Sequence, residues 1–258
     1  MVTIHPTAIV ESGAELDEGV VIGAFSYIGK QVKIGKNTVI KQGAVIEGDT
    51  SIGEECTIFG ATIGVEPQDL KYKGEPSKVI IGNRVTVREY VTIHRGTEGG
   101  GLVTKIGDNV LLMAYAHIAH DVIIGNNVII ANSVQVAGHV VIDDFAIVGG
   151  LTGIHQFVRI GKHAMVGGAS AVHRDVPPFT MAQGNRARLT GINIVGLKRR
   201  GFSRKTIRAL TATFEKVFKT AEPIQISLSE VEEEFKNFSE VIDFVNFIRS
   251  SKRGICPA

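Results

Sequence analysis

Aliphatic side chains recur at every sixth position along most of the chain. One gapless series covers residues 4–58, a second covers residues 81–93, and a third covers residues 106–172. A helix would place apolar residues at mixed spacings of three and four, and an ordinary strand would alternate by two. Neither pattern explains a period of six.

A period of six is typical of a parallel β-helix, in which each hexad supplies one short strand and its aliphatic residue points inward. If three strands close one coil, a coil takes about 18 residues, and residues i and i+18 stack on neighbouring coils. Each coil buries its faces against the next, so the scaffold is rigid and grows in one dimension. We expect the small or flexible residue that follows many of the aliphatic residues, often glycine, to let the backbone turn at the corners.

Two segments break the period, at residues 65–79 and 95–105. Insertions on a regular scaffold often carry function, because the scaffold fixes their ends and leaves their side chains free. They are therefore candidate functional loops, although a tolerated surface insertion would look the same.

The hexads stop near Pro177 and Pro178, which cannot continue ladder pairing. Helical spacing begins after Ser203, a candidate N-cap, and two further amphipathic stretches follow at about 228–238 and 241–248. We therefore predict a mainly β protein. A left-handed parallel β-helix spans residues 1–183 and a small helical domain spans residues 184–258.

Composition narrows the class of protein. The formal net charge is +2 without a strongly biased half, so bulk charge does not favour nucleic acid as a partner. Cys56 and Cys256 show no metal-like spacing, as expected in a reduced compartment. The N-terminus lacks a signal-peptide pattern, and no apolar run approaches the roughly 18 residues that span a bilayer. The sequence predicts a cytoplasmic protein with no transmembrane segment.

Polar side chains gather where three coils would stack. In the segment AHIAHD, His117 and His120 lie three residues apart, and Asp121 follows the second histidine. The stacking interval puts Gly138 over His120 and His139 over Asp121. The next coil adds two polar residues to the same wall, His155 and Gln156.

This cluster suits acyl transfer to an alcohol. A neutral histidine can accept a proton at physiological pH, and a well-placed general base is worth about 10²–10⁴ in rate. The Gly138 amide beside it could stabilise an oxyanion, an interaction worth about 2.7–4 kcal/mol per donor. His120 is then the candidate base and Asp121 its helper, while His117 falls in another column and is a groove residue.

Other interpretations of the histidines stay open. Zinc can take three histidine ligands from different strands or subunits, as in hexapeptide-repeat carbonic anhydrases. The His-x-x-His spacing here differs from the four-residue gap of that family, so we predict no metal and no cofactor. A non-catalytic scaffold with solvated histidines, binding a partner through its helical tail, would also produce the hexads.

A basic run, GLKRRGFSRK, lies where the β-helix meets the helical domain. Such runs are commonly solvated, but arginine forks also match phosphate geometry, and the charge suits an acidic carrier protein. The tail has no extended basic array with interleaved aromatic residues, which argues against nucleic acid.

Nine segments, in order along nearly the whole chain, resemble one family. The most specific are QDLKYKGEP, AHIAHD and GLKRRGFS, and they are accompanied by HPTAIV, VTIHRGT, AGHV, HQF, DVPP and QGN. Together they resemble the UDP-N-acetylglucosamine O-acyltransferases that begin lipid A synthesis in Gram-negative bacteria. The resemblance implies a homotrimer of left-handed parallel β-helices with active sites between subunits. It also implies transfer of an (R)-3-hydroxyacyl group from acyl carrier protein to the 3-hydroxyl of UDP-N-acetylglucosamine, without metal.

The resemblance also implies roles for individual positions. His120 would be the general base and the Gly138 amide the oxyanion donor, with Asp121 orienting His120. The substrate groove would be lined by Gln68, Asp69, Lys71, His117, His139, His155 and Gln156. The nucleotide diphosphate would be held by Asn193, Arg199 and Arg200.

Two positions bear on specificity. Val195 stands where the family often has an acid, which changes the contacts expected at the nucleotide end. Gly168 matches a position near the family's acyl-length ruler, with Arg186 at another variable position, and a glycine there leaves room for a longer chain. A related N-acyltransferase of the same pathway and an amino-sugar acceptor remain alternatives, although that enzyme usually carries an extra N-terminal domain and the hexads here start at Ile4.

Overall fold

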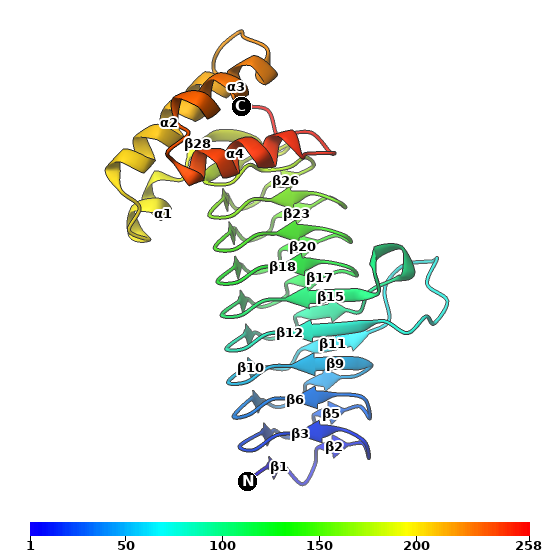
Figure 1. Cartoon of the computed structure of the whole chain (residues 1–258). Helices are drawn as coiled ribbons and strands as arrows, with labels where there is room; N and C mark the ends of the chain where they lie inside the picture. The colour runs from blue at the N-terminus through cyan, green and yellow to red at the C-terminus, as the bar shows by residue number, and fades with distance from the viewer.

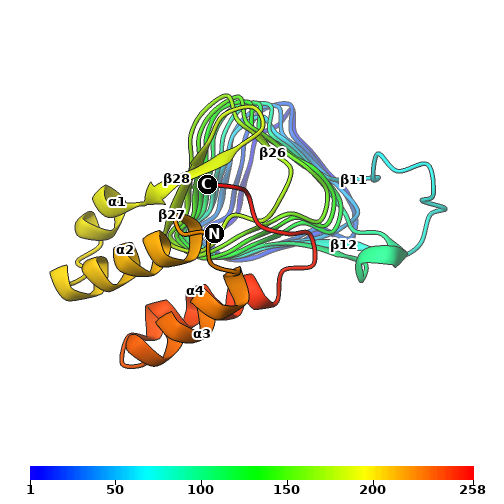
Figure 2. The same ribbon diagram turned by 90° about the horizontal axis from the view of Figure 1, so that it is seen from above.

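The structure, a computed structural model that describes residues 1–258, is a tall three-sided parallel β-helix capped by helices (Figure 1). Seen along its axis the β-helix is a triangular prism, and each side is one sheet (Figure 2). Each coil contributes one short strand to each side. The three sides are called sheets A, B and C below.

Sheet A contains β1 (Thr3–Ile4), β4 (Val21–Ile22), β7 (Val39–Ile40), β10 (Thr57–Ile58), β13 (Thr86–Val87), β16 (Leu111–Leu112), β19 (Ile129–Ile130), β22 (Ile147–Val148), β25 (Met165–Val166), β27 (Thr180–Gln183) and β28 (Arg188–Ile192). Sheet B contains β2 (Ile9–Val10), β5 (Tyr27–Ile28), β8 (Val45–Ile46), β11 (Thr62–Val65), β14 (Thr92–His94), β17 (His117–Ile118), β20 (Gln135–Val136), β23 (Gly153–Ile154) and β26 (Ala171–Val172). Sheet C contains β3 (Glu15–Leu16), β6 (Lys33–Ile34), β9 (Asp49–Ile52), β12 (Lys78–Ile81), β15 (Val103–Ile106), β18 (Ile123–Ile124), β21 (Val141–Ile142) and β24 (Arg159–Ile160).

The coils stack in the predicted register. In sheet B, Ile118 pairs with Val136 and Val136 pairs with Ile154, so partners lie 18 residues apart. Across the second insertion the interval lengthens to 25 residues, because Ile93 pairs with Ile118. The hexad aliphatics fill the prism and are fully buried from Ile22 onward, whereas Ile4 stays 46 % exposed because no coil lies beneath it. Stacking therefore buries the core, as predicted.

The corners do not use glycine as predicted. The left-handed residue of a corner lies three positions after the aliphatic residue and is usually not glycine, as at Asp121 (φ 60°) and His139 (φ 61°). The glycine directly after the aliphatic residue, such as Gly125, does not have a left-handed φ. A Cβ on Gly125 would come within 3 Å of Asp144 on the next coil. These glycines are required by the close approach of two coils, not by their own backbone freedom.

Both insertions leave the prism at the edge between sheets B and C. The first joins β11 to β12, and the second joins β14 to β15 and contains the short turn η1 (Glu98–Gly100). Figures 1 and 2 show the two segments side by side on that edge. The Glu98 N–H donates a hydrogen bond of 3.3 Å to the Glu75 carboxylate, which joins them.

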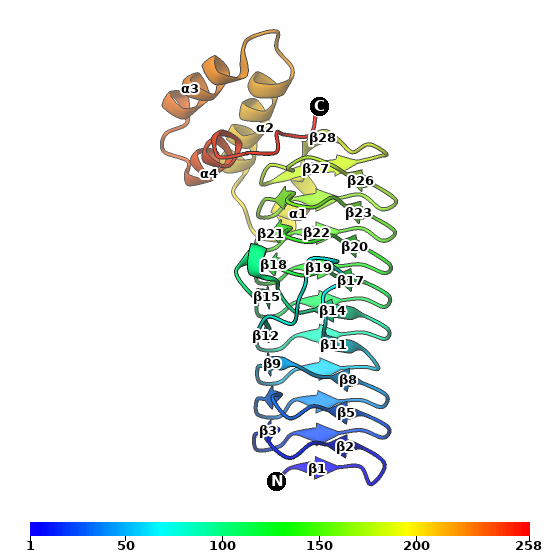
Figure 3. The same cartoon turned by 90° about the vertical axis from the view of Figure 1, so that its right-hand side faces the viewer.

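The top of the prism differs in detail from the prediction. Sheet A continues past residue 183, because β27 pairs in parallel with β25 and then in antiparallel with β28, which ends at Ile192. The antiparallel hairpin closes the open end of the sheet and leads into the helices, as Figure 3 shows. No helix combines the length and the apolar run needed to cross a bilayer.

Four helices follow: α1 (Ile194–Arg199), α2 (Arg204–Phe218), α3 (Ile224–Glu234) and α4 (Ser239–Arg249). Ser203 caps α2 as predicted, accepting the Thr206 N–H at 3.0 Å. The second predicted stretch lies about four residues too far along the chain, and α1 was not predicted. A six-residue helix has too few turns to show a periodic apolar face.

A side chain added between two coils should destabilise the protein. We expect Gly125→Ala to lower the free energy of unfolding by about 1–3 kcal/mol, because its Cβ would overlap Asp144. Gly153→Ala is the matched control, since no heavy atom lies within 4 Å of its Cβ position. Urea denaturation of both variants checks this, and equal stabilities would contradict the packing argument.

Candidate functional site

A groove runs along sheet B, and its lining follows from the hexad register. The residue directly after each aliphatic residue of sheet B leaves the strand toward the corner with sheet C. From one coil to the next these residues are His94, Ala119, Ala137, His155 and His173. All five line a cavity of about 530 Å³, together with Gln68, His117, His120, Gly138 and Gln156. The two alanines leave room between histidines, so the groove can accept an extended ligand.

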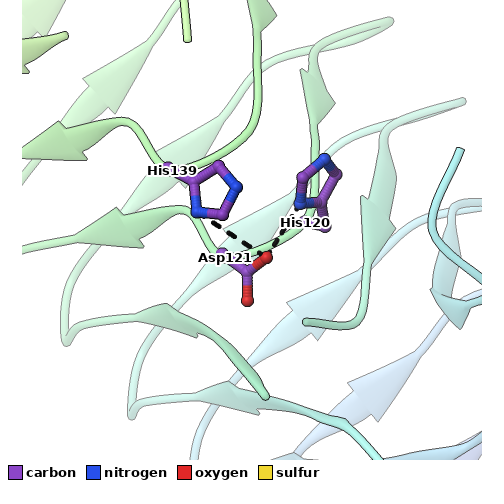
Figure 4. A group of neighbouring side chains, drawn as sticks. All are labelled: His120, Asp121 and His139. Atoms are coloured by element: carbon purple, nitrogen blue, oxygen red, sulfur yellow. Dashed lines mark hydrogen bonds and ion pairs between the residues drawn. The ribbon is translucent and has the colours of Figure 1, made fainter. Parts of the chain in front are cut away.

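His120 lies at the centre of this groove and is held from behind. It is 7 % exposed, and its Nδ1 lies 2.8 Å from the Asp121 Oδ2 (Figure 4). Because a carboxylate only accepts, the hydrogen lies on Nδ1, and Nε2 is the nitrogen left to take a proton. A histidine oriented in this way by a buried carboxylate suits a general base.

Gly138 lies directly over the His120 ring, as the register predicted. A Cβ added to Gly138 would come within 2.5 Å of His120 Cε1 and 2.6 Å of Nε2, so only glycine fits. The Gly138 N–H donates to no other group of the protein. A free backbone donor beside a base is the arrangement that stabilises an oxyanion at the atom under attack.

His117 and His94 form a second part of the groove wall. Burial, followed by repulsion from His94 and His120, lowers the pKa of His117 to about 4, and its Nδ1 lies 2.7 Å from the Thr92 hydroxyl. His94 donates from Nδ1 to the Glu66 carbonyl at 2.6 Å, and burial lowers its pKa. Both histidines are therefore neutral at physiological pH and act as hydrogen-bonding groups. No role was predicted for His94 from the sequence.

Three of the predicted groove residues lie on the other side of the corner. Asp69, Lys71 and His139 line a separate cavity of about 350 Å³ under the two insertions. His139 stacks on Phe157 with ring centroids 4.5 Å apart. Burial lowers the pKa of His139, while the nearby Asp121 carboxylate opposes this shift. The predicted single wall is therefore two walls that meet at Asp121, which is itself buried between them.

The predicted nucleotide contacts lie at another corner of the prism. Asn193 caps α1 by accepting the Gly196 N–H and donates to the His163 carbonyl. The Arg200 guanidinium lies 4.5 Å from the ring centroid of Phe145, at the corner between sheets C and A. Neither residue, nor Arg199 or Gly168, lines the His120 groove within one chain.

The cluster formed by His120, Asp121 and His139 is poorly suited to bind a metal ion. One atom each from His120, Asp121 and His139 lie within 4.8 Å of one another, the kind of grouping that could hold zinc. However, the Asp121 side chain is 1 % exposed, and both of its oxygens already accept hydrogen bonds from the second insertion. A ligand oxygen would have to give up these bonds, so the geometry fits base orientation better than zinc coordination.

Comparisons with known proteins agree with the geometry. A family model described as Udp N-acetylglucosamine O-acyltransferase, domain 2, matches residues 175–256, and a bacterial transferase hexapeptide model matches residues 104–138. The acyl-[acyl-carrier-protein]–UDP-N-acetylglucosamine O-acyltransferase of Thermodesulfovibrio yellowstonii is 53% identical over 254 residues, 98% of each chain.

Solved structures are similarly close. The UDP-N-acetylglucosamine acyltransferase of Campylobacter jejuni is 44% identical, with a TM-score of 0.94 over 99% of this chain and 100% of that one. The enzyme of Francisella novicida is 37% identical, with a TM-score of 0.96 over 99% of this chain and 94% of that one.

The low pKa of His117 predicts acid sensitivity. In the unfolded chain a histidine titrates near pH 6.5. Below that pH the unfolded chain therefore binds a proton at His117, whereas the folded protein binds it only near pH 4. The free energy of unfolding should therefore fall as the pH drops from 6.5 toward 4, by about 2 kcal/mol at pH 5 from this residue.

Denaturation of the wild type and of His117→Gln at pH 7 and pH 5 measures this contribution. The wild type should lose more stability between the two pH values than the variant does. An identical loss in both proteins would show that His117 is not the residue that resists protonation.

Proposed function

Because the chain belongs to the UDP-N-acetylglucosamine O-acyltransferase family of hexapeptide-repeat enzymes, we propose that the His120 groove is its active site. The activity is that of an acyl-[acyl-carrier-protein]–UDP-N-acetylglucosamine O-acyltransferase, the first step of lipid A biosynthesis. The observation that carries the assignment to this groove is the packing of the His120 ring directly against Gly138, whose N–H bonds no other group of the protein.

The reaction proceeds by direct attack of the sugar on the thioester. His120 Nε2 removes the proton of the glucosamine 3-hydroxyl as its oxygen attacks the carbonyl carbon of the (R)-3-hydroxyacyl thioester. The Gly138 N–H donates to the developing oxyanion. The carbon–sulfur bond then breaks, the ester remains on the sugar, and the carrier thiol leaves with the proton returned from His120.

Asp121 is a positioning residue in this scheme. It lies behind His120 and accepts the Nδ1–H, so it fixes the ring and stabilises the imidazolium formed during the reaction. It does not line the groove and does not touch the substrate.

The carrier protein approaches a basic surface. Lys198, Arg204 and Arg208 line a groove of about 820 Å³ on α1 and α2, with apolar contacts from Phe202 and Ile207. An acidic carrier protein complements these cations. Acyl chains of different length are then distinguished farther along the β-helix, near Gly168, where a glycine takes up less room than a larger side chain would.

The site is completed by a second copy of the chain in a homotrimer. Four large apolar residues are exposed along the edge between sheets A and B: Phe25 (75 %), Tyr90 (65 %), Tyr115 (58 %) and Leu151 (72 %). An apolar edge of this kind favours association with another subunit. The predicted nucleotide contacts lie at a different corner from His120, so they reach the groove of a neighbouring subunit rather than their own.

The first test removes the base. His120→Ala should lower kcat by about 10²–10⁴-fold, because no other group would take the hydroxyl proton. The assay follows acyl transfer from 3-hydroxyacyl carrier protein to UDP-N-acetylglucosamine, with a chelator present in a parallel series.

His5→Ala is the matched control, since His5 is exposed on the first coil and its side chain bonds only Thr7. It should be fully active, and chelator should not reduce the activity of the wild type. A near-normal rate for His120→Ala would refute the assignment of His120 as the base. Loss of wild-type activity in chelator would instead support a zinc-dependent enzyme.

Mixed trimers test the shared site. His120→Ala and Arg199→Ala should each be inactive alone, but trimers formed by mixing their unfolded chains should recover up to about a quarter of the wild-type activity. Random mixing pairs an intact His120 with an intact Arg199 at about one interface in four. If the mixture is no more active than the mean of its two parents, both residues act within one chain.

A further inference from the structure

We propose that Thr97, in the second insertion, is a positioning residue that holds the Asp121 carboxylate against His120. The inference rests on the proposed role of His120 as the base. Thr97 precedes the short turn η1 and has an extended backbone (φ −126°, ψ 163°), yet its hydroxyl caps no N–H of that turn. The hydroxyl is directed at Asp121 instead.

Thr97 contacts both oxygens of the carboxylate. Its hydroxyl donates to Asp121 Oδ2 at 2.6 Å, and its backbone N–H donates to Oδ1 at 2.9 Å. Oδ2 is also the atom that accepts the His120 Nδ1–H. Thr97 is 5 % exposed and Asp121 4 %, so water cannot easily replace either donor. Hydrogen bonds to a buried ionised group are among the strongest in proteins.

The segment around Thr97 is shaped to fit the carboxylate. A Cβ on Gly100 would overlap the Asp121 carboxylate, and a Cβ on Gly96 would come within 2.8 Å of Oδ1. On the opposite side, the Asp121 N–H donates to the Thr104 hydroxyl at 2.8 Å. The insertion thus encloses Asp121, and glycine at two positions allows the backbone to approach this closely.

The orientation of Asp121 matters because two histidines compete for it. His120 Nδ1 lies 2.8 Å from Oδ2, and His139 Nδ1 lies 3.8 Å from the same oxygen. A carboxylate free to rotate could turn toward His139 and leave His120 without its partner. With Thr97 bonded to both oxygens, Asp121 keeps His120 Nδ1 protonated and Nε2 available to the sugar hydroxyl.

The same segment couples the base to the first insertion. Glu75 accepts the Glu98 N–H through Oε1 and the Lys73 N–H through Oε2. Asp69 and Lys71, predicted to contact substrate, lie on that insertion. One connected unit therefore reaches from the predicted substrate-binding loop to the carboxylate behind the base.

A double-mutant cycle in the full-length enzyme tests this role. Thr97→Val keeps the β-branched shape and the extended backbone but removes the hydroxyl, and we expect it to lower kcat by about 10- to 100-fold with little change in KM. Thr97→Ser restores the hydroxyl and should recover most of the rate. In an Asp121→Asn background, Thr97→Val should have almost no further effect, because residues that act through one another are not additive.

The imidazole ¹⁵N spectrum of His120 gives a second readout. The wild type should show the Nδ1–H tautomer alone, and Thr97→Val should show both tautomers. Equal fold losses from Thr97→Val in the wild-type and Asp121→Asn backgrounds, or a Thr97→Ser variant as slow as Thr97→Val, would overturn the proposal. Those outcomes would leave the base assignment standing, whereas an active His120→Ala variant would remove the base assignment itself.

Discussion

The structure depends on one constraint, the parallel pairing of each coil with the next. Because hexad aliphatics must fill the prism, the register cannot slip by a residue without turning the core outward. Corner residues that lie 18 positions apart in an uninterrupted stretch therefore stack in a column along the prism, one residue per coil. Catalysis by two groups requires that they be held at a fixed distance. In this fold the backbone hydrogen bonds between coils, rather than side-chain packing, fix that distance. His120 and Gly138 are such a pair, one coil apart.

Left-handed residues at the corners are a general property of this fold. Asp121 and His139 both have a positive φ, but so do Asn127 and Asn37 on other coils that carry no chemistry. The strain at Asp121 is thus not a functional signal by itself. What distinguishes Asp121 is its burial, since the equivalent Asn37 is exposed and Asn127 is only half-buried, while Asp121 lies beneath the second insertion. The scaffold supplies the position and the insertion supplies the environment.

Structural features that follow the 18-residue stacking register could be predicted from the sequence. The hexads predicted the prism and the pairing of His120 with Gly138, because both residues lie in uninterrupted coils. His94 was missed because it adjoins the second insertion and Thr97 because it lies within it, where the stacking interval is 25 residues instead of 18. The glycines after the aliphatic residues were assigned to the wrong cause, since a sequence shows where glycine occurs but not which coil lies above it. The helical tail was located but its boundaries moved, because short amphipathic helices take their limits from packing and caps.

The function follows from the same division of labour. In the proposed mechanism a rigid wall holds the base and the oxyanion donor, and the second insertion holds the Asp121 carboxylate behind the base. The exposed apolar and basic surfaces are then proposed to bind another subunit and a carrier protein. No part of this scheme requires a domain movement, because His120 and Gly138 are already adjacent in the structure. The specificity for acceptor and chain length then depends on the open groove rather than on the catalytic pair.

The central claim is that this groove esterifies a sugar hydroxyl with a carrier-bound hydroxyacyl chain. The most direct measurement is to incubate the purified protein with UDP-N-acetylglucosamine and a panel of (R)-3-hydroxyacyl carrier proteins of different chain length, and to identify the product by mass spectrometry and NMR. We expect one preferred chain length and an ester at the 3-oxygen of the glucosamine. No acylated sugar with any carrier, or acylation only of a 3-amino analogue to give an amide, would contradict it.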